Sequence, residues 1–266
     1  MKDSVLAFYD DLAEAYHLIF VDWKQAISWQ GEILDKIIRS KLTNSNSDPT
    51  SLLDCSCGIG TQAIGLAKHG YNVTATDISP AAVVRAEQEA AAFGVNIDFG
   101  IADFRSLEKD VSGSFEVVLS ADNAIPHLLT DEDLYSAARN LYAKTDHEGV
   151  LIITIRNYDD LIKDKPRSTE PRVYDKGKRI VFQIWDWAED AKTYWTNQFI
   201  LQEIDGEWKT RQNKTQYRAL LRDEFSHILS AVGFTDIEWL MPAESGYYQP
   251  IVIARKQNEE DNHESR

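Results

Sequence analysis

The sequence has only two cysteines among its 266 residues, Cys55 and Cys57, and a single residue separates them. A disulfide across one intervening residue would be strained, and two thiolates are too few for a structural zinc site. Both cysteines are therefore expected to pack as small buried side chains. No disulfide framework and no metal site are predicted.

Positive charge is also scarce. The chain carries 28 Lys and Arg against 43 Asp and Glu, a formal net charge of −15. Nucleic-acid backbones and anionic membrane surfaces are bound through clustered basic residues, so both are disfavoured as partners. No run of about 18 apolar residues predicts a membrane span, and residues 1–11 lack the apolar core of a signal peptide. A cytoplasmic protein with a small-molecule partner is expected.

The glycines in residues 51–63 mark a turn between a predicted strand and a predicted helix. A short apolar strand end leads to Asp54, then to Gly58 and Gly60, after which the pattern becomes helical. A strand, a glycine turn and a helix leave free backbone N–H groups where a nucleotide-like ligand can approach closely. Gly58-x-Gly60-x-x-Ala63 also fits a loose dinucleotide fingerprint. The turn alone leaves two cofactor classes open, beside a plain tight turn.

Strand and helix patterns alternate from residue 51 to residue 155. The alternation predicts a mostly parallel sheet with helices on both faces, which binds ligands at the carboxyl ends of its strands. The expected strands are 51–55, 72–76, 96–100, 115–119 and 149–155, and the expected helices are 61–69, 80–93 and 131–144.

The flanking regions differ in character. Residues 4–42 show helical periodicity, and residues 171–219 are rich in β-branched and aromatic residues with turns between them, which predicts an antiparallel meander. A helix (222–232) and two strands (235–241 and 249–255) follow. The expected division is an N-terminal helical cap (1–45), a cofactor-binding core (46–156), an inserted β subdomain (157–219), C-terminal elements completing the core (220–256) and a disordered tail (257–266).

Polar residues follow several predicted strands. Asp77 lies 17 residues after Gly60 and can accept hydrogen bonds from ribose hydroxyls, although an NAD site would also have an acid there. Asp103, followed by Phe104, can accept the amino proton of an adenine beside an aromatic wall. Asp122, Asn123 and His127 end the next strand, where the transferred group should lie. Each acid alone is equally compatible with a helix cap or a solvated turn.

Polar groups at successive strand ends, together with Leu53-Asp-Cys-Ser-Cys-Gly-Ile-Gly60, resemble the class I S-adenosylmethionine-dependent methyltransferases. The resemblance covers roughly residues 5–256. It implies S-adenosylmethionine as cofactor and a Rossmann-like three-layer α/β sandwich. That fold has a mostly parallel seven-stranded sheet with an antiparallel last strand, and here an inserted antiparallel β meander.

A narrower resemblance is carried by Ile155-Arg-Asn-Tyr-Asp159 and Asn123-Ala-Ile-Pro-His-Leu128, which are similar to the glycine/sarcosine N-methyltransferase group. The resemblance implies that Arg156 binds the substrate carboxylate, which a guanidinium can do through two parallel hydrogen bonds. The alternative is structural: Arg156 pairs with Asp159 or Asp122 and holds the insertion in place.

The resemblance, added to the strand-end motifs, implies a set of site residues. Five of them rest on the resemblance alone: Tyr9, Tyr16, Ser56, Ala121 and Tyr217. Arg156 and Tyr217 are expected to bind substrate. Asn123, His127 and Tyr217 are expected to take part in catalysis, the first and last by offering oxygens to the amine and His127 by relaying its proton, unless His127 is a core histidine. The cofactor is expected to contact Tyr9, Tyr16, Asp54, Ser56, Gly58, Gly60, Asp77, Asp103, Phe104, Ala121 and Asn123.

The predicted function is methyl transfer from S-adenosylmethionine to the amine of a small carboxylate-bearing substrate such as glycine or sarcosine. The alternatives are a methyltransferase of the same fold with another small-molecule acceptor and, from another class, a nicotinamide-dependent oxidoreductase or a nucleotide-binding module.

Overall fold

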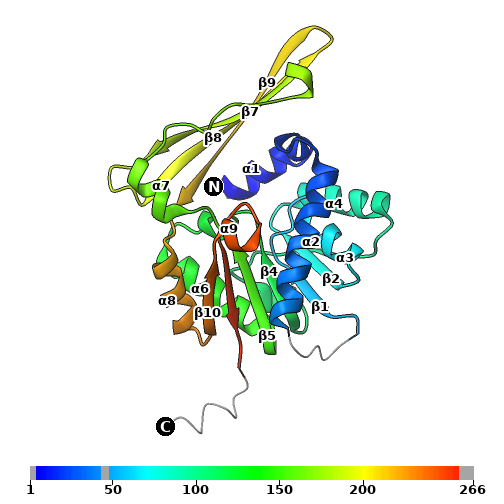
Figure 1. Ribbon diagram of the computed structural model, residues 1–266, viewed down its shortest axis with the longest axis vertical. Helices are drawn as coiled ribbons and strands as arrows, with labels where there is room; N and C mark the ends of the chain where they lie inside the picture. The colour runs from blue at the N-terminus through cyan, green and yellow to red at the C-terminus, as the bar shows by residue number, and fades with distance from the viewer. Residues whose placement is uncertain (1–3, 43–47, 258–266) are drawn as a thin grey trace.

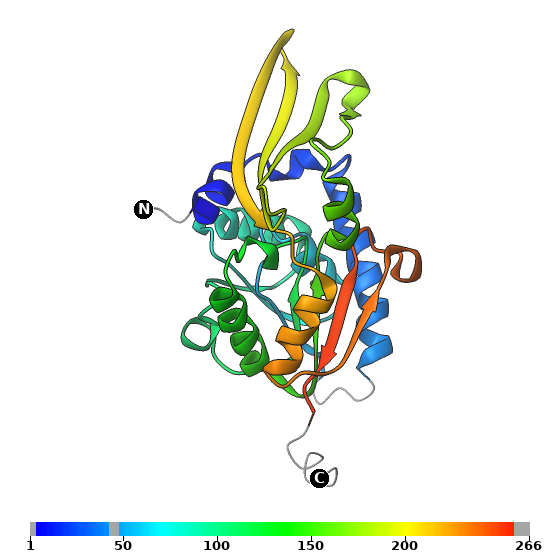
Figure 2. The ribbon, with the colours of Figure 1, turned by 90° about the vertical axis from the view of Figure 1, so that its left-hand side faces the viewer.

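The computed structural model describes residues 4–42 and 48–257, which form two sheets and the helices around them. The larger sheet lies inside an α/β body, and the smaller sheet projects from one end of that body (Figures 1 and 2). The N-terminal helix α1 (Ser4–Leu12) lies between the two (Figure 1).

The larger sheet has seven strands in the order β10-β11-β5-β4-β1-β2-β3. Neighbouring strands among β1 to β5 run parallel, whereas β11 is antiparallel to both β5 and β10. The predicted sheet is therefore confirmed. Its strands are β1 (Ser51–Asp54), β2 (Asn72–Asp77), β3 (Asp98–Ile101), β4 (Phe115–Ser120), β5 (Thr145–Thr154), β10 (Thr235–Leu240) and β11 (Ile251–Arg255).

Helices cover both faces of this sheet and give three layers (Figure 1). The longer ones are α2 (Trp23–Lys41), α3 (Thr61–Lys68), α4 (Pro80–Phe93), α6 (Asp131–Lys144) and α8 (Arg222–Ala231). The shorter ones are η1 (Tyr16–Ile19), α5 (Leu107–Asp110), η2 (Ile125–His127), α7 (Tyr158–Asp164), η3 (Asp175–Gly177) and α9 (Pro242–Ser245). In the described part of the chain, no helix has both the length and the apolar character needed to cross a bilayer.

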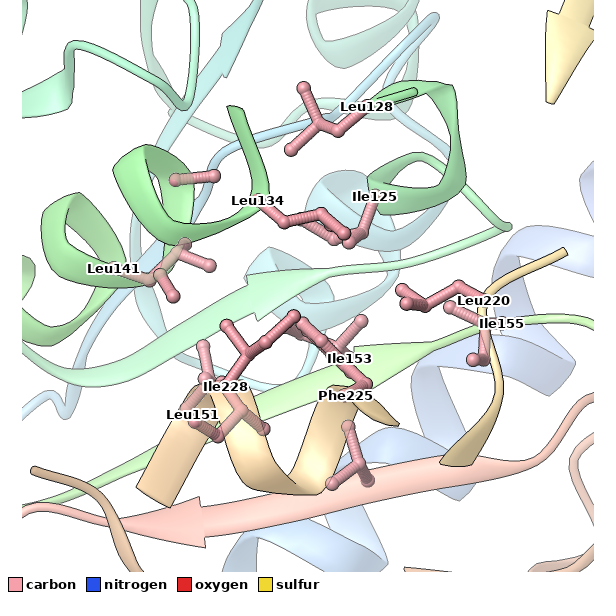
Figure 3. Close-up of a cluster of buried hydrophobic side chains, with 14 of the residues drawn as sticks. Ile125, Leu128, Leu134, Leu141, Leu151, Ile153, Ile155, Leu220, Phe225 and Ile228 are labelled. Carbon is pink, nitrogen blue, oxygen red and sulfur yellow. The ribbon is translucent and has the colours of Figure 1, made fainter. Parts of the chain in front are cut away.

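The core follows from the period of two along each strand. Leu53 and Val118 pack with α6 and α8, whereas Leu52, Val117 and Leu119 pack with α2 and α3. Figure 3 shows the first of these clusters, in which Leu134 and Leu141 of α6 meet residues of β5 and Phe225 and Ile228 of α8. Because the central strands are buried on both faces, they are continuous apolar runs rather than alternating ones.

Two helices have the bounds that their capping residues predict. The Ser79 hydroxyl accepts the Ala82 N–H at 3.1 Å, Pro80 occupies the first helical position, and Gly94 ends α4 with φ 68°. The Thr130 hydroxyl likewise caps α6. These caps satisfy backbone groups that have no partner inside the helix.

The smaller sheet is antiparallel in the order β6-β7-β8-β9. A two-residue turn, Asp205–Gly206, joins its long hairpin, and both residues have positive φ, as hairpin turns of this length favour. The meander is therefore present, with one strand more than the three expected. Its strands are β6 (Arg172–Tyr174), β7 (Arg179–Trp187), β8 (Thr193–Ile204) and β9 (Glu207–Arg218).

Some boundaries differ from the sequence prediction. β5 begins at Thr145 rather than residue 149, because the β4–β5 pairing also includes Phe115 and Thr145. Helix α7 precedes the small sheet inside the segment 157–219. The expected disordered tail 257–266 lies almost wholly outside the described residues.

Candidate active site

Two cavities open at the carboxyl ends of the central strands, as predicted for this type of sheet. The inner cavity, about 300 Å³, is lined by the turn after β1 and by the ends of β2, β3 and β4. The outer groove, about 1010 Å³, lies between the N-terminal helices, α7 and the small sheet. Tyr9, Tyr16 and Asp122 line both, so the two cavities meet at these three side chains.

The glycine turn forms the floor of the inner cavity. Gly58 and Gly60 have φ values of 53° and 91°, and Gly60 is the N-cap of α3. The Gly58 N–H donates to Asp77 Oδ2 at 2.8 Å, and the Ser79 N–H donates to the other oxygen of Asp77 at 2.9 Å. One carboxylate therefore fixes the turn after β1 and the start of α4 together.

Buried acids without an ion-pair partner lie in the wall of the inner cavity and directly beside it. Asp54 is fully buried and its Oδ2 atom has no hydrogen-bond partner, and burial raises the pKa of Asp54 to about 8. Burial also raises the pKa values of Asp77 and Asp122. Because burial is the first cause of these shifts, the surroundings of the three carboxyls disfavour charge, and an added anion is opposed further by each carboxyl that is ionised. The cavity therefore opposes an anionic group such as the pyrophosphate of a dinucleotide.

Asp103 is engaged by a residue that the sequence prediction missed. The Arg105 side chain donates to both oxygens of the Asp103 carboxylate, with the Nε atom at 3.0 and 2.9 Å, and also reaches Asp133. Phe104 lies beside them in the cavity wall. Arg105 is the basic residue of this wall, and its charge is balanced by these two acids. The Arg105 backbone N–H also donates to Asp103 Oδ1 at 2.8 Å, so both carboxylate oxygens already accept hydrogen bonds and a ligand amino group would have to share them with Arg105.

Most of the predicted cofactor residues line the inner cavity: Tyr9, Tyr16, Ser56, Gly58, Asp77, Asp103, Phe104 and Ala121, with His127 beside them. Asp54 and Gly60 lie outside its lining. Asn123, Arg156 and Tyr217 line the outer groove instead. The cysteines are buried and unbridged, as expected.

Arg156 follows β5 and has only neutral partners. Its guanidinium donates to the Tyr194 hydroxyl at 2.6 Å and to Gln183 Oε1 at 3.1 Å, and it lies 5.1 and 5.0 Å from the ring centres of Trp185 and Tyr217. Burial opposes its charge, but the surrounding tyrosine hydroxyls, Tyr194 first, keep the pKa of Arg156 above its ordinary value. The structural alternative of a pairing with Asp159 or Asp122 is not seen among the described residues.

Asn123 presents a donor to the groove, not the expected oxygen. Its Oδ1 atom accepts the Arg156 N–H and the Tyr158 hydroxyl, both at 3.0 Å, while its buried Nδ2 atom has no acceptor. Asp122 and Asn123 both have positive φ (58° and 69°), which these two residue types tolerate better than most. Asp122 lines both cavities, and Asn123 lines the outer groove alone.

His127 has hydrogen-bonding neighbours at both ring nitrogens, and the Thr215 hydroxyl also lies 3.4 Å from its Nδ1 atom. Its Nδ1 atom is 3.2 Å from the Gln216 carbonyl oxygen, which can only accept, so Nδ1 carries the proton and Nε2 accepts the Tyr9 hydroxyl at 2.9 Å. Burial lowers the pKa of His127 to about 3. The ring also packs 4.1 Å from Tyr217. A neutral imidazole with both nitrogens engaged orients Tyr9 more readily than it accepts a proton.

The sequence prediction also missed the aromatic residues around Asp122. The hydroxyls of Tyr247 and Tyr248, which follow α9, both donate to Asp122 Oδ1, the first at 2.8 Å. Trp29 of α2 stacks on the Tyr247 ring, with centroids 5.8 Å apart and planes 3° apart. These residues are more than 90 positions from Asp122 in sequence, and no local motif marks them.

A metal centre is not indicated, since the residues described by the structure contain no group of three or more His, Cys, Asp or Glu arranged to hold an ion.

Comparison with known proteins agrees with this geometry. Residues 52–149 match the family described as "Methyltransferase domain". A glycine/sarcosine N-methyltransferase of Parasynechococcus marenigrum (strain WH8102) is 29% identical over 54% of this chain and 49% of its own length. A glycine/sarcosine N-methyltransferase of Aphanothece halophytica is 24% identical over 86% of this chain and 80% of its own length. The chain thus spans about half of the first relative and four-fifths of the second.

Among solved structures, an S-adenosylmethionine-dependent methyltransferase from Clostridium acetobutylicum ATCC 824 superposes with a TM-score of 0.73 at 16% identity. The match covers 94% of this chain and 99% of the other. At that identity the likeness shows a shared fold. Residues 52–149 are thus similar to the methyltransferase domain family, the fold is shared with an S-adenosylmethionine-dependent methyltransferase, and the sequence is similar to glycine/sarcosine N-methyltransferases.

Proposed function

We propose that the protein transfers the methyl group of S-adenosylmethionine to the amine of a small substrate that bears a carboxylate, such as glycine or sarcosine. The two relatives named above are glycine/sarcosine N-methyltransferases. The comparisons lend no support to the nicotinamide alternative, and the buried acids in and beside the inner cavity argue against it.

The observation that carries the proposal is the environment of Arg156. Its guanidinium lines the groove, and two of its five N–H groups are engaged by Tyr194 and Gln183. No described carboxylate forms an ion pair with it. A partly buried charge without a counter-ion is unfavourable, and a substrate carboxylate would supply that counter-ion through a charge-assisted, bidentate contact.

The proposed roles follow from position. Residues 46–156 hold the cofactor, whose sulfonium supplies an electrophilic methyl group. The small sheet and α7, within residues 157–219, cover the acceptor. Arg156 binds the carboxylate, Tyr217 packs against its guanidinium, and the free Asn123 Nδ2 donor is available to a substrate oxygen. Methyl transfer chiefly requires proximity and orientation, which can supply about 7–11 kcal/mol.

A second candidate is a methyltransferase for a larger amine. The outer groove, at about 1010 Å³, is at the upper end of ordinary ligand-site volumes and is large for glycine. Exposed aromatic side chains, Trp29 and Tyr248, lie in its wall and could contact a longer acceptor.

A methyl-transfer screen tests the proposal. Glycine, sarcosine and dimethylglycine are compared with amines of matched size that lack the carboxylate, and calorimetry compares S-adenosylhomocysteine with NAD. We expect turnover of the carboxylate-bearing amines and binding of S-adenosylhomocysteine alone. Turnover of only larger amines would favour the second candidate, and binding of NAD without S-adenosylhomocysteine would overturn both.

A further inference from the structure

The junction of the two cavities contains one group able to accept a proton. The reacting amine must lie where the inner cavity meets the outer groove, and among the residues that the structure describes only Tyr9, Tyr16 and Asp122 line both. Burial raises the pKa values of Tyr9 and Tyr16 well above the ordinary value for tyrosine, so both hydroxyls stay protonated. His127 is already engaged by Tyr9. Asp122 is therefore the remaining candidate for the proton acceptor.

We propose that Asp122 accepts the proton that the acceptor's ammonium group must lose before methyl transfer, with Tyr247 and Tyr248 positioning its carboxylate. The inference rests on the proposed function for the identity of the acceptor. In the step, an N–H bond of the ammonium breaks and an O–H bond forms on the carboxylate, so an ammonium and a carboxylate become a neutral amine and a carboxylic acid. The amine lone pair is then free to attack the methyl group.

The hydrogen-bond network around Asp122 can absorb that proton. The Tyr247 hydroxyl has a single hydrogen but lies 2.8 Å from two acceptors, Asp122 Oδ1 and Gln30 Oε1. While Asp122 is ionised, Tyr247 can donate to it. Once Asp122 is protonated, it can donate to the Tyr247 oxygen, and the Tyr247 hydrogen turns to Gln30. The network therefore has a satisfied arrangement in both protonation states.

The charged and titratable surroundings are compatible with this role. Asp54 at the end of β1 and Tyr16 on η1 interact electrostatically with Asp122. Tyr247 and Tyr248, from the segment after α9, and Gln62 of α3 face it with hydrogen-bonding groups. Arg156 lies in the same groove but does not pair with it. No Lys, Arg or His within residues 4–42 and 48–257 forms an ion pair with Asp122, so its carboxylate is free to change its charge.

The test uses the full chain with whichever amine of the screen it methylates. Asp122→Asn keeps a residue type that tolerates the left-handed backbone but removes the proton acceptor. We expect kcat/KM to fall by roughly 10²–10⁴-fold at neutral pH, and partly to recover as the pH approaches the pKa of the amine itself. Tyr248→Phe removes a donor to the carboxylate and should shift the acidic limb of the pH profile upward. Asp236→Asn is the matched control: this exposed aspartate of β10 also has a positive φ (48°) but lines neither cavity, so the profile should be unchanged.

A second readout does not depend on turnover. Carbon-13 NMR of labelled aspartate, with the Asp122 signal identified by its loss in Asp122→Asn, should show that carboxyl titrating above the ordinary range for aspartate. If no amine is methylated, the proposed function fails and this titration alone decides the role of Asp122. An Asp122→Asn profile of the same shape as the parent, or a carboxyl that titrates in the ordinary range, would overturn the inference.

Discussion

The backbone N–H of Arg156 donates a 3.0 Å hydrogen bond to the side-chain oxygen of Asn123, which joins the residues after β4 and β5 at the outer groove. The Tyr158 hydroxyl donates to the same oxygen, and the two donors together fix the orientation of the Asn123 amide. The amide nitrogen is left as a buried donor without an acceptor. A buried donor of this kind is unfavourable in the free protein and becomes satisfied when a ligand oxygen reaches it.

Asn123→Asp should separate these two roles. Aspartate keeps an oxygen for Arg156 and Tyr158 and tolerates the left-handed backbone, but it has no N–H to offer. We expect kcat/KM for the accepted amine to fall by roughly 10–100-fold, the value of one hydrogen bond to a charged group, with little change in thermal unfolding. Asn157→Asp, which alters another asparagine of the groove, is the control. Equal effects of the two substitutions in steady-state kinetics would remove the special role of Asn123.

Arg156→Lys tests carboxylate binding. Lysine keeps the positive charge but loses the planar fork, its second N–H contact and its packing over Trp185 and Tyr217. The KM for the carboxylate-bearing amine should rise by roughly 10–100-fold, while calorimetric affinity for S-adenosylhomocysteine stays the same. Arg172→Lys, an exposed arginine that also lines the groove, should change neither quantity. An unchanged KM in Arg156→Lys would contradict the proposal that Arg156 binds the substrate carboxylate.

The sheet and the inner cavity could be predicted from the sequence alone, because the residue patterns that mark them are local. Ser79 and Thr130 cap helices whose ends were predicted correctly, and Gly58 and Gly60 mark a turn that needs positive φ. The direction of the Asn123 amide was not accessible in this way. It depends on Arg156 and Tyr158, more than 30 residues away, and on which hydrogen bonds they form.

The same limit applies to Asp122. Its partners Tyr247 and Tyr248 come from the C-terminal segment and reach it only because β11 lies beside β5. For Asp103 the sequence prediction was only partly incomplete. Its position was predicted, but Arg105, two residues later, engages the same carboxylate. Strand-end acids can thus be located from sequence, whereas their charge balance requires the structure.

Asp54→Asn should change how stability depends on pH. In the folded protein the pKa of Asp54 is raised to about 8 by burial, from an ordinary value of 3.8. Between these values the folded state binds a proton that the unfolded state does not, so the free energy of unfolding falls as pH rises. One such group contributes at most about 1.4 kcal/mol per pH unit.

Urea unfolding at pH 5.5 and pH 8 measures the effect of Asp54. The parent should lose stability between the two, whereas Asp54→Asn, which can still accept the Ser56 N–H, should lose distinctly less. Asp77 and Asp122 remain and act in the same direction, so some decline should persist. Identical pH dependence in the two proteins would show that Asp54 is ionised in the folded state.

Gly65→Ala tests the close contact between α2 and α3, the helix that follows the glycine turn. A Cβ atom at Gly65 would lie 2.7 Å from the Ile27 carbonyl oxygen and 3.0 Å from the Gly31 Cα, so α2 and α3 touch through their backbones. Alanine favours a helix by about 1 kcal/mol over glycine, but backbone atoms cannot yield as a flexible side chain can, and overpacking costs about 1–3 kcal/mol. The clash should therefore outweigh the gain in helix propensity, and the free energy of unfolding should fall.

The Trp23–Thr61 bond at the start of both helices should also be disturbed by Gly65→Ala, which would weaken S-adenosylhomocysteine binding. Gly100→Ala is the control, because its Cβ would meet only the Thr76 methyl group at 3.4 Å. A Gly65→Ala protein as stable as Gly100→Ala in urea would mean that the two helices can separate without cost.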